Sequence, residues 1–245
     1  MKPFLDNPLI LLSIPVRTTF RDLVDRLSTR KVPNTLLDTA REIYGSSCDI
    51  SQPRALLYWL EVTDTEKDHL YLGEPGLSPR IKISTGYSSR FLLPARMAAV
   101  IICTIGPELE TAAHTFAAEK QYLHSYLYEI MSMAVLEKTT EYINGIIEKE
   151  AAARDWGVGP LLSPGSVHGW ELTDQAVLCS HLALDKIDVS CTDDGVLRPF
   201  NSLSFVVGIG PGYAERKISS PCTVCQNRDT CTESPPQAPL DLNGD

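Results

Sequence analysis

An almost continuous apolar run near the middle of the chain limits the folds that this sequence can adopt. The segment Met97 to Ile105 (MAAVIICTI) is rich in β-branched residues and contains no charged side chain. It is too short to span a bilayer and is typical of a buried strand. It leads into Gly106-Pro107-Glu108-Leu109-Glu110, where a proline and two acidic residues indicate the first turn of a helix. The run therefore predicts a central strand followed by a helix.

Composition and charge exclude several classes of partner. The 245 residues are 43% hydrophobic, enough to bury a core as one large domain or two smaller ones. The formal net charge is −9, and no block of Lys and Arg could follow a phosphate backbone or an anionic membrane surface. We therefore expect neither nucleic acid nor membrane as a partner.

Cysteine usage and the N-terminus indicate a cytoplasmic protein. The seven cysteines, an odd number without regular spacing, argue against a disulfide framework. The N-terminus lacks the basic start and cleavage site of a secretory signal. The apolar segment Pro8 to Pro15 (PLILLSIP) is too short to cross a bilayer and predicts another buried strand.

The other predicted elements mix strands and helices. Apolar positions at helical spacing predict an amphipathic helix from Val16 to Lys31, and Asn34 is the predicted N-cap of a second helix that ends near Tyr44. Further elements are strands at 55–62, 80–84, 187–190 and 203–207, and helices at 107–120, 121–154 and 173–184, with Gly- and Pro-containing connections at 73–79 and 156–169. The order has no clean βαβ alternation and favours an α+β fold.

The long predicted helix carries two acidic residues on its apolar stripe. At about 100° per residue, the stripe continues onto Glu137 and Glu141 from Leu123, Tyr126, Leu127, Ile130 and Ala134. A buried carboxylate is unfavourable unless it is paired or hydrogen-bonded. Two interpretations stay open. Either the apolar face rotates toward Ile143, Ile146 and Ile147 and leaves both acids in solvent, or one acid faces a cleft and binds a ligand rich in hydrogen-bond donors.

A Ser-Pro-Gly loop joins the long helix to the shorter one. In Leu161-Leu162-Ser163-Pro164-Gly165-Ser166, the Pro-Gly pair predicts a tight turn with exposed backbone amides that a ligand can approach closely. The alternative is a simple connector, capped by Thr173 or Asp174.

The order of these segments resembles the reactivation domain of vitamin B12-dependent methionine synthase, in its stand-alone form. The resemblance rests on the acid-bearing helix, the Ser-Pro-Gly loop and the following helix with Gln175. It also rests on Pro199 to Ser204 (PFNSLS), which is similar to the family's Pro-x-x-Ser-Val-Ser strand, and on Cys103 to Glu110 (CTIGPELE). It covers about Ile101 to Cys231 well and the preceding residues loosely.

The resemblance implies a C-shaped α+β fold with a central antiparallel sheet and surrounding helices. It divides the chain into an N-terminal α+β portion (1–95), an activation-domain-like core (96–220), a cysteine-rich segment (221–231) and a tail (232–245). The Pro-rich, acidic tail has a composition typical of disorder. Domains of this family lie over a corrin ring, bind S-adenosylmethionine and remethylate cobalt after its accidental oxidation.

The resemblance also implies ligand contacts for an S-adenosylmethionine and corrinoid site, at Glu141, Ser163, Pro164, Gly165, Ser166 and the later Tyr213. However, the family pattern is Arg-x-x-Pro-Gly-Tyr, and this chain has Leu161 and Ser166 in place of the Arg and the Tyr. Arg holds a carboxylate through two parallel hydrogen bonds, which Leu cannot replace. The ligand carboxylate would have to bind Arg154 or Arg198 instead, or S-adenosylmethionine binds weakly. His168 departs from the family pattern and is either an exposed loop residue or a cobalt ligand.

Three cysteines near the end of the chain have the spacing Cys-x2-Cys-x5-Cys, at Cys222, Cys225 and Cys231. Three thiolates can hold zinc, with a fourth ligand such as Cys191 or a His, or they can hold an iron–sulfur cluster. They can also be free thiols. Stand-alone members of the resembled family end in a similar segment, which favours a metal. A cluster would supply a low-potential electron, whereas zinc would be structural.

These features predict an accessory protein that docks on a corrinoid-bearing protein or methyltransferase module and assists reductive reactivation or methyl transfer at cobalt. One alternative is an enzyme that methylates cob(I)alamin from S-adenosylmethionine. Another is a corrinoid-binding or delivery module with a structural metal. No catalytic residue is assigned.

Overall fold

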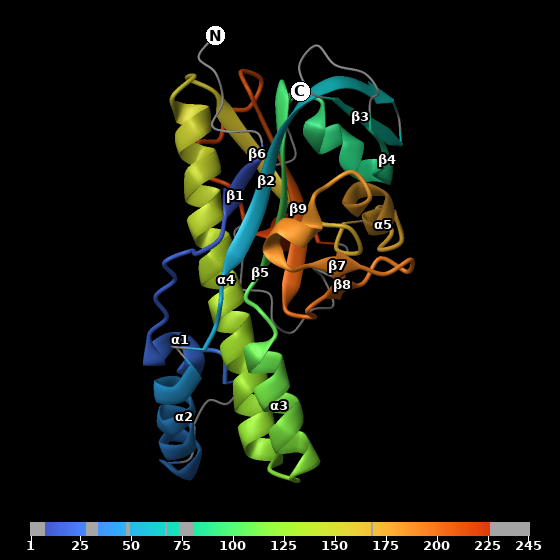
Figure 1. Cartoon of the computed structure of the whole chain (residues 1–245). Helices are drawn as coiled ribbons and strands as arrows, with labels where there is room; N and C mark the ends of the chain where they lie inside the picture. The colour runs from blue at the N-terminus through green and yellow to red at the C-terminus, as the bar shows by residue number, and fades with distance from the viewer. Residues whose placement is uncertain are drawn as a thin grey trace.

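The computed structural model describes residues 8–27, 34–47, 50–66, 68–73, 81–167 and 169–225. Within them, a seven-stranded sheet has the order β4-β3-β2-β5-β9-β6, with β1 beside β2, and neighbouring strands are antiparallel. The strands are β1 (Leu9–Leu11), β2 (Arg54–Glu66), β3 (His69–Gly73), β4 (Ile81–Ser84), β5 (Met97–Thr104), β6 (Gly157–Leu162) and β9 (Ser202–Gly210). A separate hairpin pairs β7 (Ser190–Cys191) with β8 (Leu197–Arg198). The predicted α+β fold with a central antiparallel sheet and helices around it is confirmed (Figure 1).

Strand β5 lies between β2 and β9, and all eight of its residues are buried. Alternate residues, such as Ile101 and Cys103, belong to the core on one face of the sheet. Ala98 and Val100 belong to a second cluster on the other face. Because both faces are covered, the strand needs no polar alternation, which accounts for the continuous apolar run.

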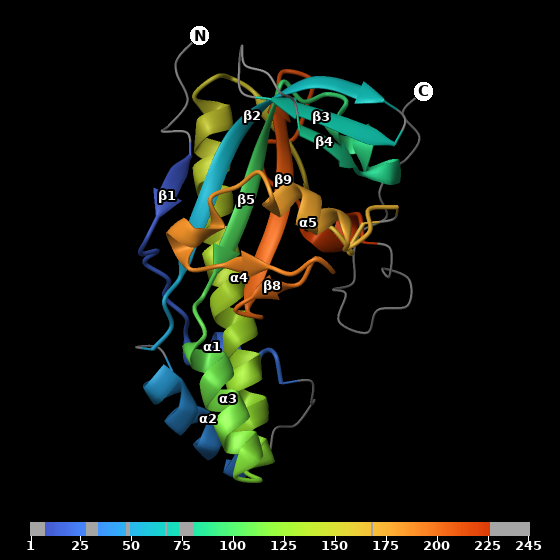
Figure 2. The same ribbon diagram turned by 45° about the vertical axis from the view of Figure 1, so that its right-hand side comes forward.

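The long helix α4 (Tyr122–Ala152) connects the two ends of the molecule. Its second half covers one face of the sheet through Ile143, Ile147 and Ala151. Its first half packs beyond the sheet against three other helices (Figure 1), namely α1 (Phe20–Val24), α2 (Asn34–Ser47) and α3 (Glu108–Ala118). The opposite face of the sheet is covered by α5 (Asp174–Cys179) and the 3-10 helices η1 (Gly86–Leu92) and η2 (Leu184–Ile187) (Figure 2).

Several predicted elements differ from the structure. Within the described part of the predicted helix 16–31, only Phe20–Val24 is helical. Thr19 and Asp22 form a capping box, which fixes the start of this helix at Phe20. The predicted strand 187–190 is wrong: Ile187 ends a 3-10 helix, and Asp188 follows in a left-handed conformation with φ 55°. The strand β3 was not predicted, and neither was β6, whose Gly157, Gly159 and Pro160 suggest a connection. The predicted disordered tail lies outside the described residues.

In the described part of the chain, no helix is long and apolar enough to span a membrane.

Candidate loop site and its surroundings

The Ser-Pro-Gly loop leaves the sheet at the end of β6. Gly165 has φ 76°, in the left-handed region that favours glycine, and this confirms the predicted tight turn. The amide of Gly165 donates to the carbonyl oxygen of Trp170 at 2.8 Å, and the amide of Ser166 donates to that of Ser163 at 3.1 Å. Both amides are therefore already used inside the loop, so the predicted open backbone donors are not present at these two residues.

A buried polar network fixes the base of this loop. The hydroxyl of Ser163 donates to the main-chain carbonyl oxygen of Ser204 at 2.9 Å. The hydroxyl of Ser204 donates to the side-chain oxygen of Gln175, whose amide donates to the carbonyl oxygen of Gly195 at 2.6 Å. The network ties β6, β9, α5 and the β7–β8 turn together. Ser204 was not predicted as a site residue; its signal is a serine directly before the apolar run Phe205-Val206-Val207 of β9.

The cysteine-rich segment lies against the same loop. Val167 and Cys225 form an antiparallel β-bridge directly after the 3-10 helix η3 (Pro221–Thr223). Cys222 and Cys225 are partly exposed free thiols. Cys231 and His168 lie outside the described residues. Within the described ranges, no three His, Cys, Asp or Glu side chains are grouped to hold a metal ion, so Cys191 does not complete a described site with Cys222 and Cys225.

The position expected to hold Arg is sealed inside the core. Leu161 is only 2% exposed and belongs to the same cluster as Ile143 and Ile147 of α4. Of the two alternative arginines, Arg154 is buried and ion-paired with Glu150 at 2.6 Å on its own helix. Arg198 lies on the short strand β8 with an exposed side chain. Neither Leu161 nor the paired Arg154 therefore presents an accessible guanidinium to a carboxylate at the loop.

The two acids of α4 are ion-paired near the helical end of the molecule. Glu137 pairs with Arg26, and Glu141 pairs with Lys138 at 3.0 Å; both acidic side chains are more than half exposed. Lys138 also lies 3.7 Å from Asp22 of α1. The apolar face rotates as the first interpretation predicts, since Ile143 and Ile147 are fully buried.

Glu141 and the loop network are on different sides of the sheet. Helix α4 covers the face that contains Leu161 and Phe205, whereas Val167, Trp170 and Leu178 pack on the opposite face. The network reaches α5 on that opposite face through Gln175. The structure therefore brings Ser163, Pro164, Gly165, Ser166 and Cys225 together, and it places Glu141 elsewhere.

Tyr213 packs on a patch of glycines. Its hydroxyl donates to the carbonyl oxygen of Phe91 at 2.6 Å. A Cβ atom built on Gly159 would meet the tyrosine ring at 2.9 Å, and one on Gly208 would meet its hydroxyl at 2.1 Å. Burial raises the pKa of Tyr213 above its ordinary value. Gly159, which makes β6 resemble a connection in sequence, and Gly208 of β9 therefore provide the space for this side chain.

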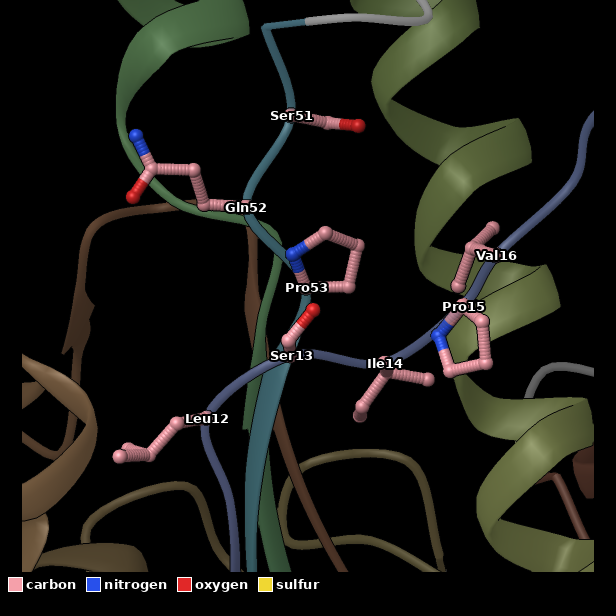
Figure 3. A pocket seen from close by; sticks show the side chains of 8 residues that line it. All are labelled: Leu12, Ser13, Ile14, Pro15, Val16, Ser51, Gln52 and Pro53. Atoms are coloured by element: carbon pink, nitrogen blue, oxygen red, sulfur yellow. The ribbon is translucent and has the colours of Figure 1, made fainter.

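A pocket of about 260 Å³ lies away from these residues, where the N-terminal segment meets the start of β2 (Figure 3). It is lined by Leu12–Val16 and Ser51–Pro53, and Ile14 and Val16 point toward α4. None of the predicted ligand-binding residues lines it. Its lining carries no charged side chain, so it offers no counter-ion for a sulfonium or carboxylate.

Comparisons with known proteins identify a relative in fold. No protein-family model matches the chain, and no curated protein matches it. Among solved structures, the chain resembles the crystal structure of the MetH reactivation domain bound to AdoHcy. The TM-score is 0.56 and the sequence identity 13%, over 88% of this chain and 84% of that chain. At this identity, the likeness establishes a shared fold and a distant structural relationship. The chain has the reactivation-domain fold.

Proposed function

We propose that this chain is a cytoplasmic accessory protein of a corrinoid-dependent methyltransferase system, which docks on a corrinoid-bearing protein and assists reactivation or methyl transfer at cobalt. The observation that supports this proposal is the reactivation-domain fold over 88% of the chain. Conservation of the fold without the Arg at position 161 favours docking over methyl donation.

The residues present do not fit S-adenosylmethionine in the way that the resemblance implies. Leu161 is buried, the amides of Gly165 and Ser166 are occupied, and Glu141 lies on the other side of the sheet from the loop network. A carboxylate ligand would find no bidentate cation at these positions. We therefore assign no methyl-transfer step to these residues.

S-adenosylmethionine-dependent methylation of cob(I)alamin is the second candidate, because the solved structural relative carries AdoHcy. Isothermal titration with S-adenosylmethionine and with AdoHcy separates the candidates. Heat that is lost in Glu141→Gln but kept in the matched variant Glu137→Gln would favour the enzyme. If neither ligand produces heat with the wild-type chain, the methylation of cob(I)alamin from S-adenosylmethionine is excluded.

Docking on a corrinoid-bearing protein is tested by ultraviolet–visible spectroscopy of the corrinoid. The chain is purified anaerobically and added to cob(II)alamin, both free and bound to a corrinoid domain of a methionine synthase. We expect the ultraviolet–visible bands of the protein-bound corrinoid to shift. Unchanged spectra together with no co-elution on gel filtration would contradict docking on this class of partner.

The role of Cys222, Cys225 and Cys231 is tested on the same anaerobic preparation. We propose that they hold a metal beside the loop, because Cys225 pairs with Val167 at the loop's end. Iron and sulfide in stoichiometric amounts, with a visible absorption band, would favour an electron-transfer role. Stoichiometric zinc would favour a structural role in a corrinoid-binding or delivery module. A metal-free preparation would contradict both.

A further inference from the structure

Two cysteines outside the loop site lie at one apolar cluster, on neighbouring elements of the fold. Cys179 is the last residue of α5, and Cys191 is the last residue of β7. Both are free thiols, and the Cys191 thiol donates to the carbonyl oxygen of Thr192 at 3.5 Å. Cys179 is 4% exposed, whereas Cys191 is partly exposed. Both pack at the same apolar cluster, with Ile187 and Val189.

Independent bonds hold the two cysteines in place. On α5, one turn before Cys179, Gln175 donates to the carbonyl oxygen of Gly195 in the β7–β8 turn at 2.6 Å. That turn is closed by the amide of Thr192, which donates to the carbonyl oxygen of Val196 at 2.9 Å. Gly195 has φ 81°, and a Cβ on it would lie 2.2 Å from the carbonyl oxygen of Leu172. The elements that carry the two cysteines are therefore held together by contacts that do not depend on the thiols.

We propose that Cys179 and Cys191 form a redox-active dithiol that is oxidised to a disulfide by exchange with a small disulfide such as oxidised glutathione. The Cys191 thiolate attacks one sulfur of the small disulfide, which forms a mixed disulfide and releases one thiolate. The Cys179 sulfur then loses its proton and attacks the Cys191 sulfur, which forms the intramolecular bond and releases the second thiolate. Two protein thiols are oxidised, and one small disulfide is reduced to two thiols.

Exposure sets the order of the two steps. Cys191 is reached by solvent, whereas burial raises the pKa of the Cys179 thiol to about 12 and keeps it protonated. Cys179 is therefore the resolving thiol. The disulfide would join α5 to β7 next to Gln175, which also receives the hydrogen bond from Ser204 below the Ser-Pro-Gly loop. Oxidation would thus fix the position of α5 relative to β7, beneath the Ser-Pro-Gly loop.

The experiment equilibrates the full chain with mixtures of reduced and oxidised glutathione. Free thiols are then alkylated under denaturing conditions, and the protein is digested with trypsin. Cleavage after Arg154, Lys186 and Arg216, with none at the Arg198–Pro199 bond, gives peptides 155–186 and 187–216, each with a single cysteine. We expect a cross-link between these two peptides and an unfolding midpoint raised by roughly 5–10 °C.

Matched variants make the result specific. Cys191→Ser should abolish the cross-link and the shift in the unfolding midpoint, whereas Cys222→Ser should retain both. Cys179→Ser should retain a stable mixed disulfide on Cys191, which reports the proposed order. A wild-type chain that keeps only a glutathione adduct on Cys191, or that links Cys191 to Cys222 or Cys225, would overturn the proposal. Circular dichroism of each variant confirms that it folds.

Discussion

The hydroxyl of Ser204 on β9 donates a hydrogen bond to the side-chain oxygen of Gln175 on α5, and both residues are buried. The amide of Gln175 is satisfied by Gly195, and the carbonyl oxygen of Ser204 accepts from Ser163. A strand, a helix and two turns thus share one polar network inside an apolar layer. Because an unpaired polar group in such a place is costly, the network fixes one arrangement of the loop.

Gln175→Leu should destabilise the protein by about 2–3 kcal/mol. The substitution leaves the Ser204 hydroxyl and the Gly195 carbonyl oxygen without their partner in a buried site. Urea unfolding monitored by circular dichroism measures the loss. The exposed residue Gln121, in the variant Gln121→Leu, serves as the control and should lose less than about 0.5 kcal/mol. Equal effects at the two positions would contradict the importance of the network.

Leu161→Arg should unfold or strongly destabilise the protein, by at least about 3 kcal/mol, and should not create a ligand site. Leu161 is 2% exposed and packs against the face covered by α4, so the guanidinium would be buried without a partner. Chemical denaturation measures the change. The control is Leu172→Arg, at a side chain that is 42% exposed. A folded Leu161→Arg variant with new affinity for S-adenosylmethionine would show that this position opens to a cleft.

Gly208→Ala should cost about 1–3 kcal/mol, and part of that cost should disappear in a Tyr213→Phe background. The new Cβ would lie 2.1 Å from the tyrosine hydroxyl, which Phe lacks. Tyr213→Phe by itself should cost about 1 kcal/mol through the lost hydrogen bond to Phe91. A double-mutant cycle on unfolding free energies gives the coupling. Strict additivity would mean that the ring does not fill this patch.

The contribution of Asp22 to stability should depend on pH. Hydrogen bonds from Thr19, assisted by Lys138, hold the pKa of Asp22 below its ordinary value of 3.8. The resulting stability is present above pH 3.8 and is lost as the pH falls through the lowered pKa. Thermal unfolding of wild type and Asp22→Asn should therefore differ near neutral pH and converge in acid. Asp25→Asn, at a side chain that is 64% exposed, should show a smaller difference near neutral pH.

The sequence predicted the elements whose signal is local and strong. Pro107 with its following acids marked the start of the helix at Glu108, and the periodic apolar residues of α4 predicted its full length to within a few residues. The predictions of two short elements were wrong. Strand β6 contains glycines that pack against Tyr213, which is distant in sequence. The segment at Ile187 forms a turn that packs on an apolar cluster. The periodicity of a segment does not predict these packing contacts, because they involve residues far away in the chain.

The candidate site was predicted in part. The turn at Pro164-Gly165 is local and was found, and the approach of Cys225 to Val167 joins two predicted features. The separation of Glu141 from the loop network follows from the two faces of one sheet. A sequence pattern orders these features along the chain, but it does not say on which side of the sheet each one lies.

By itself, the sequence determined the buried central strand, the long helix and the mixed α+β class, because these depend on side chains that repeat within a few residues. The tertiary structure decided which groups meet. It paired Glu137 with Arg26 across 111 positions of the chain, buried Leu161 beneath α4, and packed Cys179 and Cys191 at one apolar cluster. Contacts of this kind depend on how the packed layers bring distant segments together, and the chemistry of the molecule follows from them.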